Sequence, residues 1–134
     1  MKNRIIILLV VIINVIAVML NFGGFLMGNP ATQLNLIVSI VYLMIWISVS
    51  VYAYIQEDIL LNKFMLIYWG ISMSISILSI KVSISLLVPL YIIYFAPFYG
   101  FTTFFKTYIP TFSFVMSVIS ILFVIMAAYF HKRL

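Results

Sequence analysis

The side chains that could do chemistry are few, and their spacing does not suit catalysis. The 134 residues include two acids, one histidine and no cysteine. Glu57 and Asp58 are adjacent, and adjacent positions on a helix point about 100° apart, while His131 stands alone in the C-terminal tail. Catalysis needs acid, base, nucleophile or metal-ligating groups that converge on one place. We therefore expect no enzyme activity, no catalytic or metal-binding residue and no cofactor.

Lys81 is the charged residue that most needs an explanation, because a long apolar segment surrounds it. A lysine at the centre of a membrane-spanning helix costs about 2.5–3.5 kcal/mol. The two acids are expected near the opposite membrane surface, out of its reach. Three interpretations stay open. Lys81 reaches the outer interface and lipid phosphate, pairs with an acid of a partner chain, or lines a watery cavity that takes an anionic lipid or ligand.

Residues 71–85, ISMSISILSIKVSIS, alternate apolar and polar side chains as a β-strand does. Unpaired backbone groups in hydrocarbon cost several kcal/mol each, so we expect a helix instead. On a helix the alternation gives two opposite polar stripes, which favours a place in the middle of a bundle. One stripe is a small-residue seam for close helix packing, made of Ser72, Ser76, Ser79 and Ser83. The other stripe begins at Gly70 and offers candidate functional contacts at Ser74, Lys81 and Ser85.

A second set of candidate residues follows one face of the apolar run before it, at spacings of three and four. These are Asn35, Ser39, Tyr42, Trp46, Ser50, Ala53 and Glu57. We expect this face to pack against residues 64–88, or to line a polar cavity with them. Asn14 is expected to make an interhelical hydrogen bond, and the last apolar run has a weaker stripe at Ser113, Ser117, Ser120 and Ala127.

The elements that position these residues are four apolar runs, about 5–27, 34–55, 64–88 and 109–130. Each is longer than the 18 or so residues of a membrane-spanning helix, and 7% charged residues are far below the roughly 25% of soluble domains. We expect an all-α polytopic membrane protein, one domain over residues 1–134, with four transmembrane helices in an up-down bundle. A five-span alternative needs a turn at 79–83, where there is neither glycine nor proline.

The basic residues predict the orientation of the chain. Lys2 and Arg4 precede the first run, and His131, Lys132 and Arg133 follow the last. By the positive-inside rule both termini are cytoplasmic and the chain is a multi-pass protein of the plasma membrane. Because the net charge of +5 is scattered around the spans, we expect contact with the lipid bilayer and not with nucleic acid. Abundant isoleucine with little alanine and glycine suggests a bacterial source.

Residues 91–108 form the connection before the last run, and half of them are aromatic. Tyrosine and tryptophan favour the membrane–water interface. We expect an aromatic interfacial segment that lies on the outer leaflet; a lid over a hydrophobic ligand is the alternative.

These expectations favour a small membrane accessory protein that acts by helix–helix association with itself or with a larger membrane complex. A transporter subunit, a membrane regulator and an immunity-type protein all fit. The alternative is a small transporter, channel or holin-like oligomer, with a polar path lined by the runs 34–55 and 64–88.

Overall fold

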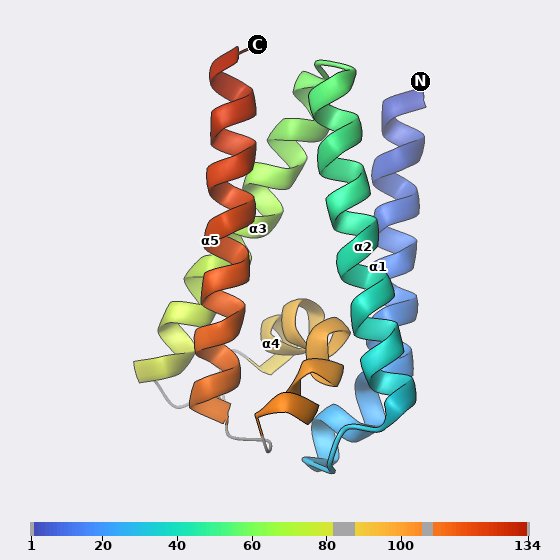
Figure 1. Cartoon of the computed structure of the whole chain (residues 1–134), viewed down its shortest axis with the longest axis vertical. Helices are drawn as coiled ribbons and strands as arrows, with labels where there is room; N and C mark the ends of the chain where they lie inside the picture. The colour runs from blue at the N-terminus through green and yellow to red at the C-terminus, as the bar shows by residue number, and fades with distance from the viewer. Residues whose placement is uncertain (1, 82–87, 106–108, 134) are drawn as a thin grey trace.

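The computed structural model describes residues 2–81, 88–105 and 109–133 of the chain, with side chains over 4–79, 88–105 and 111–132. The described residues are helical almost throughout (Figure 1). In chain order the elements are α1 (Lys2–Met27), α2 (Gln33–Ile55), α3 (Ile59–Lys81), α4 (Val88–Phe95), the 3-10 helix η2 (Ala96–Phe104) and α5 (Ile109–Arg133). Four of these helices, α1, α2, α3 and α5, are long and apolar enough to cross a membrane. The N- and C-termini lie at the same end of the molecule (Figure 1).

Side-chain caps set where two of the long helices begin. Thr32 caps α2, because its hydroxyl accepts the backbone N–H of Asn35 and the Asn35 side chain accepts the backbone N–H of Thr32. Asp58 caps α3 by accepting the N–H groups of Leu60 and Leu61. This cap explains why α3 begins at Ile59, before the expected span 64–88.

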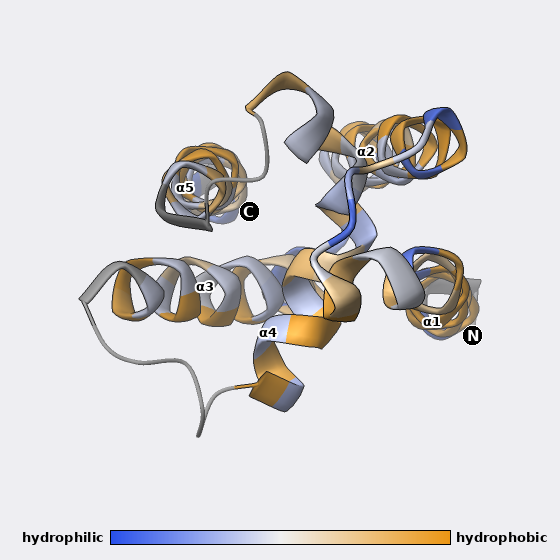
Figure 2. Cartoon of the chain, turned by 90° about the horizontal axis from the view of Figure 1, so that it is seen from below, coloured by the Kyte–Doolittle hydropathy of each residue, from blue (hydrophilic) through white to orange (hydrophobic). Residues whose placement is uncertain are grey.

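The alternating stretch is helical over its described part, residues 71–81. Its first stripe faces α5, the most extensive helix partner of α3, and the Ser72 and Ser120 hydroxyls are hydrogen bonded at 2.9 Å. The second stripe is open to the outside at Ser74, which is exposed and donates to the Gly70 carbonyl of its own helix. The expected central position of this helix is therefore wrong, because α3 presents one side to the outside. Its axis is strongly tilted relative to the axes of the other long helices (Figures 1 and 2).

The aromatic segment differs most from expectation. Helices α4 and η2 fold back between the long helices at the end away from the termini (Figure 1), and η2 packs mainly on α2 and α1. Phe95 and Phe98 are fully buried, and Pro97 is among the fully buried side chains. The expected segment that lies on the bilayer is thus corrected to an insertion into the protein. Buried polar side chains hold it there, as described below.

Candidate functional site

The polar face of α2 is the candidate site whose geometry is best defined. Six of its seven positions are buried inside the chain. Only Glu57 is exposed, in the turn after α2, where its φ of 49° lies in the left-handed region. The face meets a different partner at each level, so it is described below from the α4–η2 end toward the termini.

At the first level, side-chain amides and a hydroxyl bind the backbone of η2. The Ser39 hydroxyl donates to the Pro97 carbonyl at 2.8 Å and accepts the Gly100 N–H at 2.9 Å. Asn21 of α1 donates to the carbonyls of Ala96 and Pro97 at 2.8 and 3.2 Å. Backbone groups that α4 and η2 bring into the interior thereby gain partners, as buried backbone groups require.

Asn35 extends this network and allows η2 to approach α2 closely. Its side-chain amide donates to Asn21 Oδ1 at 2.9 Å. Its backbone carbonyl lies so near Gly100 that a Cβ at residue 100 would overlap it and the Cα of Leu36. Glycine is therefore required at this contact, because any side chain would push the two backbones apart.

At the second level, three helices share one cluster of hydroxyl and amide groups. The Tyr42 hydroxyl donates to Asn14 Oδ1 at 2.6 Å and is hydrogen bonded to the Tyr68 hydroxyl at 2.8 Å. The expected interhelical role of Asn14 is thus confirmed, with tyrosines of α2 and α3 as its partners.

At the third level, aromatic rings fill the centre of the bundle. Trp46 stacks on Tyr68 with ring centroids 4.6 Å apart, and Trp69 stacks on Phe123 of α5 at 4.3 Å. The two indoles meet edge to face at 5.1 Å. One helical turn further toward the termini, Ser50 donates to the Trp46 carbonyl of its own helix. This packing leaves the polar face of α2 occupied by contacts within the chain, from Asn35 to Ala53.

The serine seam of α3 makes one hydrogen bond to α5 and two within its own helix. Ser72 pairs with Ser120, Ser76 donates to the Ser72 carbonyl at 2.7 Å, and Ser79 donates to the Ser76 carbonyl at 2.8 Å. Ser83 and Ser85 lie outside the described residues, as does the side chain of Lys81 at the end of α3. The anionic lipid or ligand expected at Lys81 therefore stays a prediction.

A double-mutant cycle on Ser72 and Ser120 should show a favourable coupling of about 0.6 kcal/mol, the average for interhelical hydrogen bonds in a membrane protein, and at most about 1.7 kcal/mol. The two single alanine variants and the double variant are compared by their free energies of unfolding in mixed micelles. A matched cycle of Ser72 with exposed Ser48, which donates to Met44 of its own helix, should show no coupling. A coupling near zero in both cycles would contradict the hydrogen bond.

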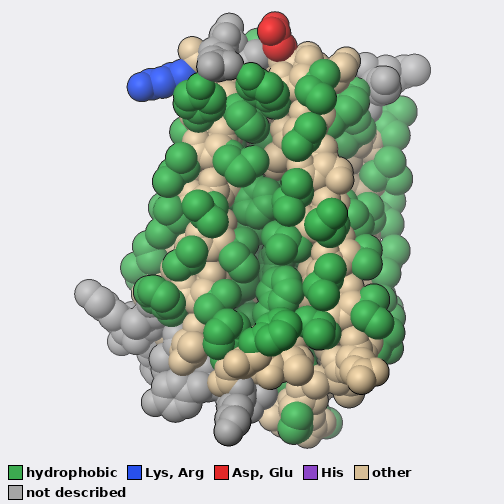
Figure 3. All heavy atoms as spheres, in the orientation of Figure 1, with side chains coloured by type: hydrophobic (Ala, Val, Ile, Leu, Met, Phe, Trp, Pro, Cys, Tyr) green, Lys and Arg blue, Asp and Glu red, His purple; other side chains and the backbone are tan. Residues whose placement is uncertain are grey.

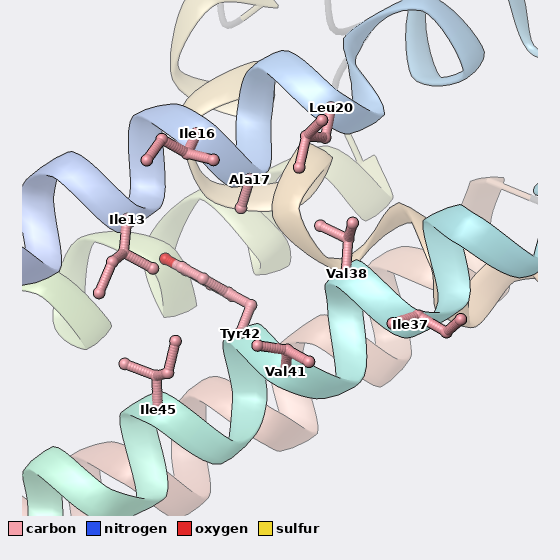
Figure 4. A pocket seen from close by; sticks show the side chains of 9 residues that line it. All are labelled: Ile13, Ile16, Ala17, Leu20, Ile37, Val38, Val41, Tyr42 and Ile45. Atoms are coloured by element: carbon pink, nitrogen blue, oxygen red, sulfur yellow. The ribbon is translucent and has the colours of Figure 1, made fainter.

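A pocket of about 180 Å³ lies between α1 and α2 (Figure 4). Its lining is almost wholly aliphatic, and includes Ile16 and Leu20 of α1 and Ile37 and Val41 of α2. Tyr42 points across the pocket toward α1 (Figure 4), but its hydroxyl is already bonded to Asn14. The pocket therefore offers a hydrocarbon-like surface and no free polar group for a polar solute.

Over the described residues the outer surface is largely apolar, and the charged side chains lie at one end. On the face shown in Figure 3, hydrophobic side chains cover the length of the helices, and the visible basic and acidic side chains lie at the end with the termini. Glu57, Lys63 and Lys132 are exposed. In the part of the chain that the structure describes, no three His, Cys, Asp or Glu residues are grouped so that they could hold a metal ion.

Sequence reasoning missed Asn21, which is fully buried and central to the network that holds η2. The signal was present: an amide in an otherwise apolar run, two helical turns after Asn14. A buried amide needs partners, but its partners on η2 are 75 and 76 residues away along the chain.

Fold and site together define an all-helical protein with four helices able to cross a membrane, wrapped around an inserted aromatic segment. No known protein family, curated protein or solved structure matches the chain.

Proposed function

We propose that this chain is a small integral membrane protein that acts by helix–helix association, with itself or with a larger membrane protein complex. An accessory transporter subunit, a membrane regulator and an immunity-type protein are its candidate roles. The observation that carries the proposal is that the polar face of α2 makes its hydrogen bonds inside the chain, with η2, Asn14 and Tyr68. The surface left for a partner is the apolar exterior of the long helices.

The proposal includes a topology. In it α1, α2, α3 and α5 cross the plasma membrane of a bacterium in up-and-down order, with both termini in the cytoplasm. Two features support it. The termini lie at the same end of the molecule (Figure 1), and basic residues flank α1 and α5 at that end, where Arg4 and Lys132 are placed.

The alternative, a transport path lined by α2 and α3, loses support from the same contacts. A path needs polar groups that face a wet space, whereas Ser39 and Tyr42 are fully engaged and Trp46 is enclosed by rings. Ser74 lies on the outside of the chain, so that it could line a path only between copies.

Single-cysteine variants test the proposal cleanly, because the chain has no cysteine. We expect Ser74→Cys on α3 or Met19→Cys on α1, both at exposed positions, to give a defined cross-linked product with a bis-maleimide in native membranes. Labelling of Ser74→Cys by a membrane-impermeant thiol reagent should be slow, because lipid or a partner covers that face.

Two control variants calibrate the result. Asn29→Cys, in the exposed turn after α1, should label rapidly, and Ser76→Cys, which is fully buried, should neither label nor cross-link. Rapid labelling of Ser74→Cys without any cross-linked product would contradict the proposal and favour a water-filled path between copies.

A further inference from the structure

Two buried oxygen atoms at the start of α3 lack a hydrogen-bond donor. Asp58 is 6% exposed and Asn62 is 1% exposed. Asp58 Oδ1 accepts the N–H groups of Leu60 and Leu61 at 3.0 and 3.1 Å, but its Oδ2 has no partner. Asn62 donates through Nδ2 to the Ala127 carbonyl at 3.0 Å, and its Oδ1 has no partner.

These two side chains lie close together where three helices meet. The Asn62 N–H donates to the Asp58 carbonyl at 3.0 Å, which places the residues one helical turn apart on the same side of α3. The Asp58 N–H donates to the Ala53 carbonyl of α2 at 3.1 Å, and Ala127 belongs to α5. The site is therefore enclosed by α2, α3 and α5 at the end with the termini.

Rotating the Asn62 amide does not remove the deficit. With Oδ1 and Nδ2 exchanged, the Ala127 carbonyl would face a second acceptor and lose its donor. Among the described side chains no basic group forms an ion pair with Asp58. The N-terminus of α3 supplies only about half a positive charge to the carboxylate that caps it, and a buried carboxylate whose charge is incompletely balanced is unfavourable. A cation at this place would complete the charge balance and contact both oxygens.

We propose that Asp58 Oδ2 and Asn62 Oδ1 bind a sodium ion that holds together the ends of α2, α3 and α5. Carboxylate and amide oxygens are the ligands that hard cations prefer. One positive charge matches the single buried carboxylate, because the other acid of the chain, Glu57, is exposed. A bridging water would satisfy both oxygens but would add no positive charge to the part that the N-terminus of α3 supplies.

The test compares the thermal stability of the full chain in dodecyl maltoside micelles in sodium chloride and in choline chloride of equal ionic strength. Fluorescence of Trp46 and Trp69, which are fully buried, reports unfolding. We expect sodium to raise Tm by about 3 °C or more, because an ion that binds only the folded state stabilises it by mass action.

Asp58→Asn should lose this response and keep its fold without sodium. Asparagine caps helices as well as aspartate does, and its amide can donate to Asn62 Oδ1. The matched control is Glu57→Gln, which removes the same charge one residue earlier at an exposed position and should keep the full response. A sodium response that persists in Asp58→Asn would overturn the proposal.

The wild-type comparison is decisive without any variant. Equal Tm values in sodium and choline overturn the site, and so does a Tm in choline that changes between pH 6 and 8 with no effect of sodium, which would assign the charge to a proton. These outcomes are independent of the cross-linking result, so the cation site and the proposed association can fail separately.

Discussion

Gly100→Ala is expected to destabilise the protein by about 3–5 kcal/mol, because a Cβ meets closer atoms here than at any other glycine of the chain. The new Cβ would overlap the Asn35 carbonyl and the Cα of Leu36, which are backbone atoms inside a capped helix and cannot move aside. Overpacking of this kind costs about 1–3 kcal/mol. Displacement of η2 would also break the Gly100–Ser39 hydrogen bond, and each buried group left unpaired costs about 1–3 kcal/mol more.

The matched control for this variant is Gly70→Ala. Nothing lies within 4 Å of a Cβ at Gly70, in the middle of α3, and replacing an unconstrained helical glycine by alanine stabilises by roughly 0.5–1 kcal/mol. Free energies of unfolding from titration with dodecyl sulfate in mixed micelles measure both. Effects of opposite sign are expected; a Gly100→Ala variant as stable as wild type would mean that η2 does not pack on α2 in this way.

The long helices could be predicted from the sequence because each is an uninterrupted apolar run, and hydrocarbon permits few other structures. The buried face of α2 was also readable, since its polar and aromatic residues repeat at helical spacing. Which partner that face meets was not. Packing against α3 was expected, whereas the Asn35 and Ser39 end packs on η2. Whether any residue of this face contacts another protein stays a prediction.

The position of the aromatic segment could not be read from composition. Tyrosine and phenylalanine are as suitable for a buried core as for a membrane interface, so residues 91–104 fit both. The deciding contacts come from single polar atoms far away along the chain, such as Asn21 on α1, and from a glycine that removes a steric barrier. Neither feature has a local pattern, and both are meaningful only once the helices are assembled.

The exposed position of Ser74 could not be predicted from the sequence either. Two polar stripes on residues 71–85 suggested that α3 needs protein on both sides. A serine in a helix can instead satisfy itself, and Ser74 does so by donating to the Gly70 carbonyl at 2.9 Å. One polar face of α3 can therefore stay on the outside at little cost, and only the Ser72 face requires a partner helix.

Asn21 decides whether η2 stays inside the bundle. Leucine at this position has a similar size but removes the donor to the Ala96 and Pro97 carbonyls and the acceptor for the Asn35 amide. The Ala96 carbonyl and the Asn35 amide would then lose these partners in a region closed to water, while the Pro97 carbonyl keeps the Ser39 hydroxyl. Because each costs about 1–3 kcal/mol and neighbouring groups relax together, we expect Asn21→Leu to lower the free energy of unfolding by about 2–4 kcal/mol.

The loss should be local before it is global, because α3 and α5 pack on each other without Asn21. Hydrogen exchange is expected to rise first over η2, including the Gly100 N–H that Ser39 protects, while exchange in α3 stays slow. Asn29→Leu is the matched control, since its side chain is exposed and its hydrogen bonds to Gly24 and Tyr99 are made by its backbone. It should change stability by less than about 0.5 kcal/mol. Equal hydrogen-exchange rates over η2 in Asn21→Leu and in wild type would show that the aromatic rings hold η2 and that the amide network is dispensable.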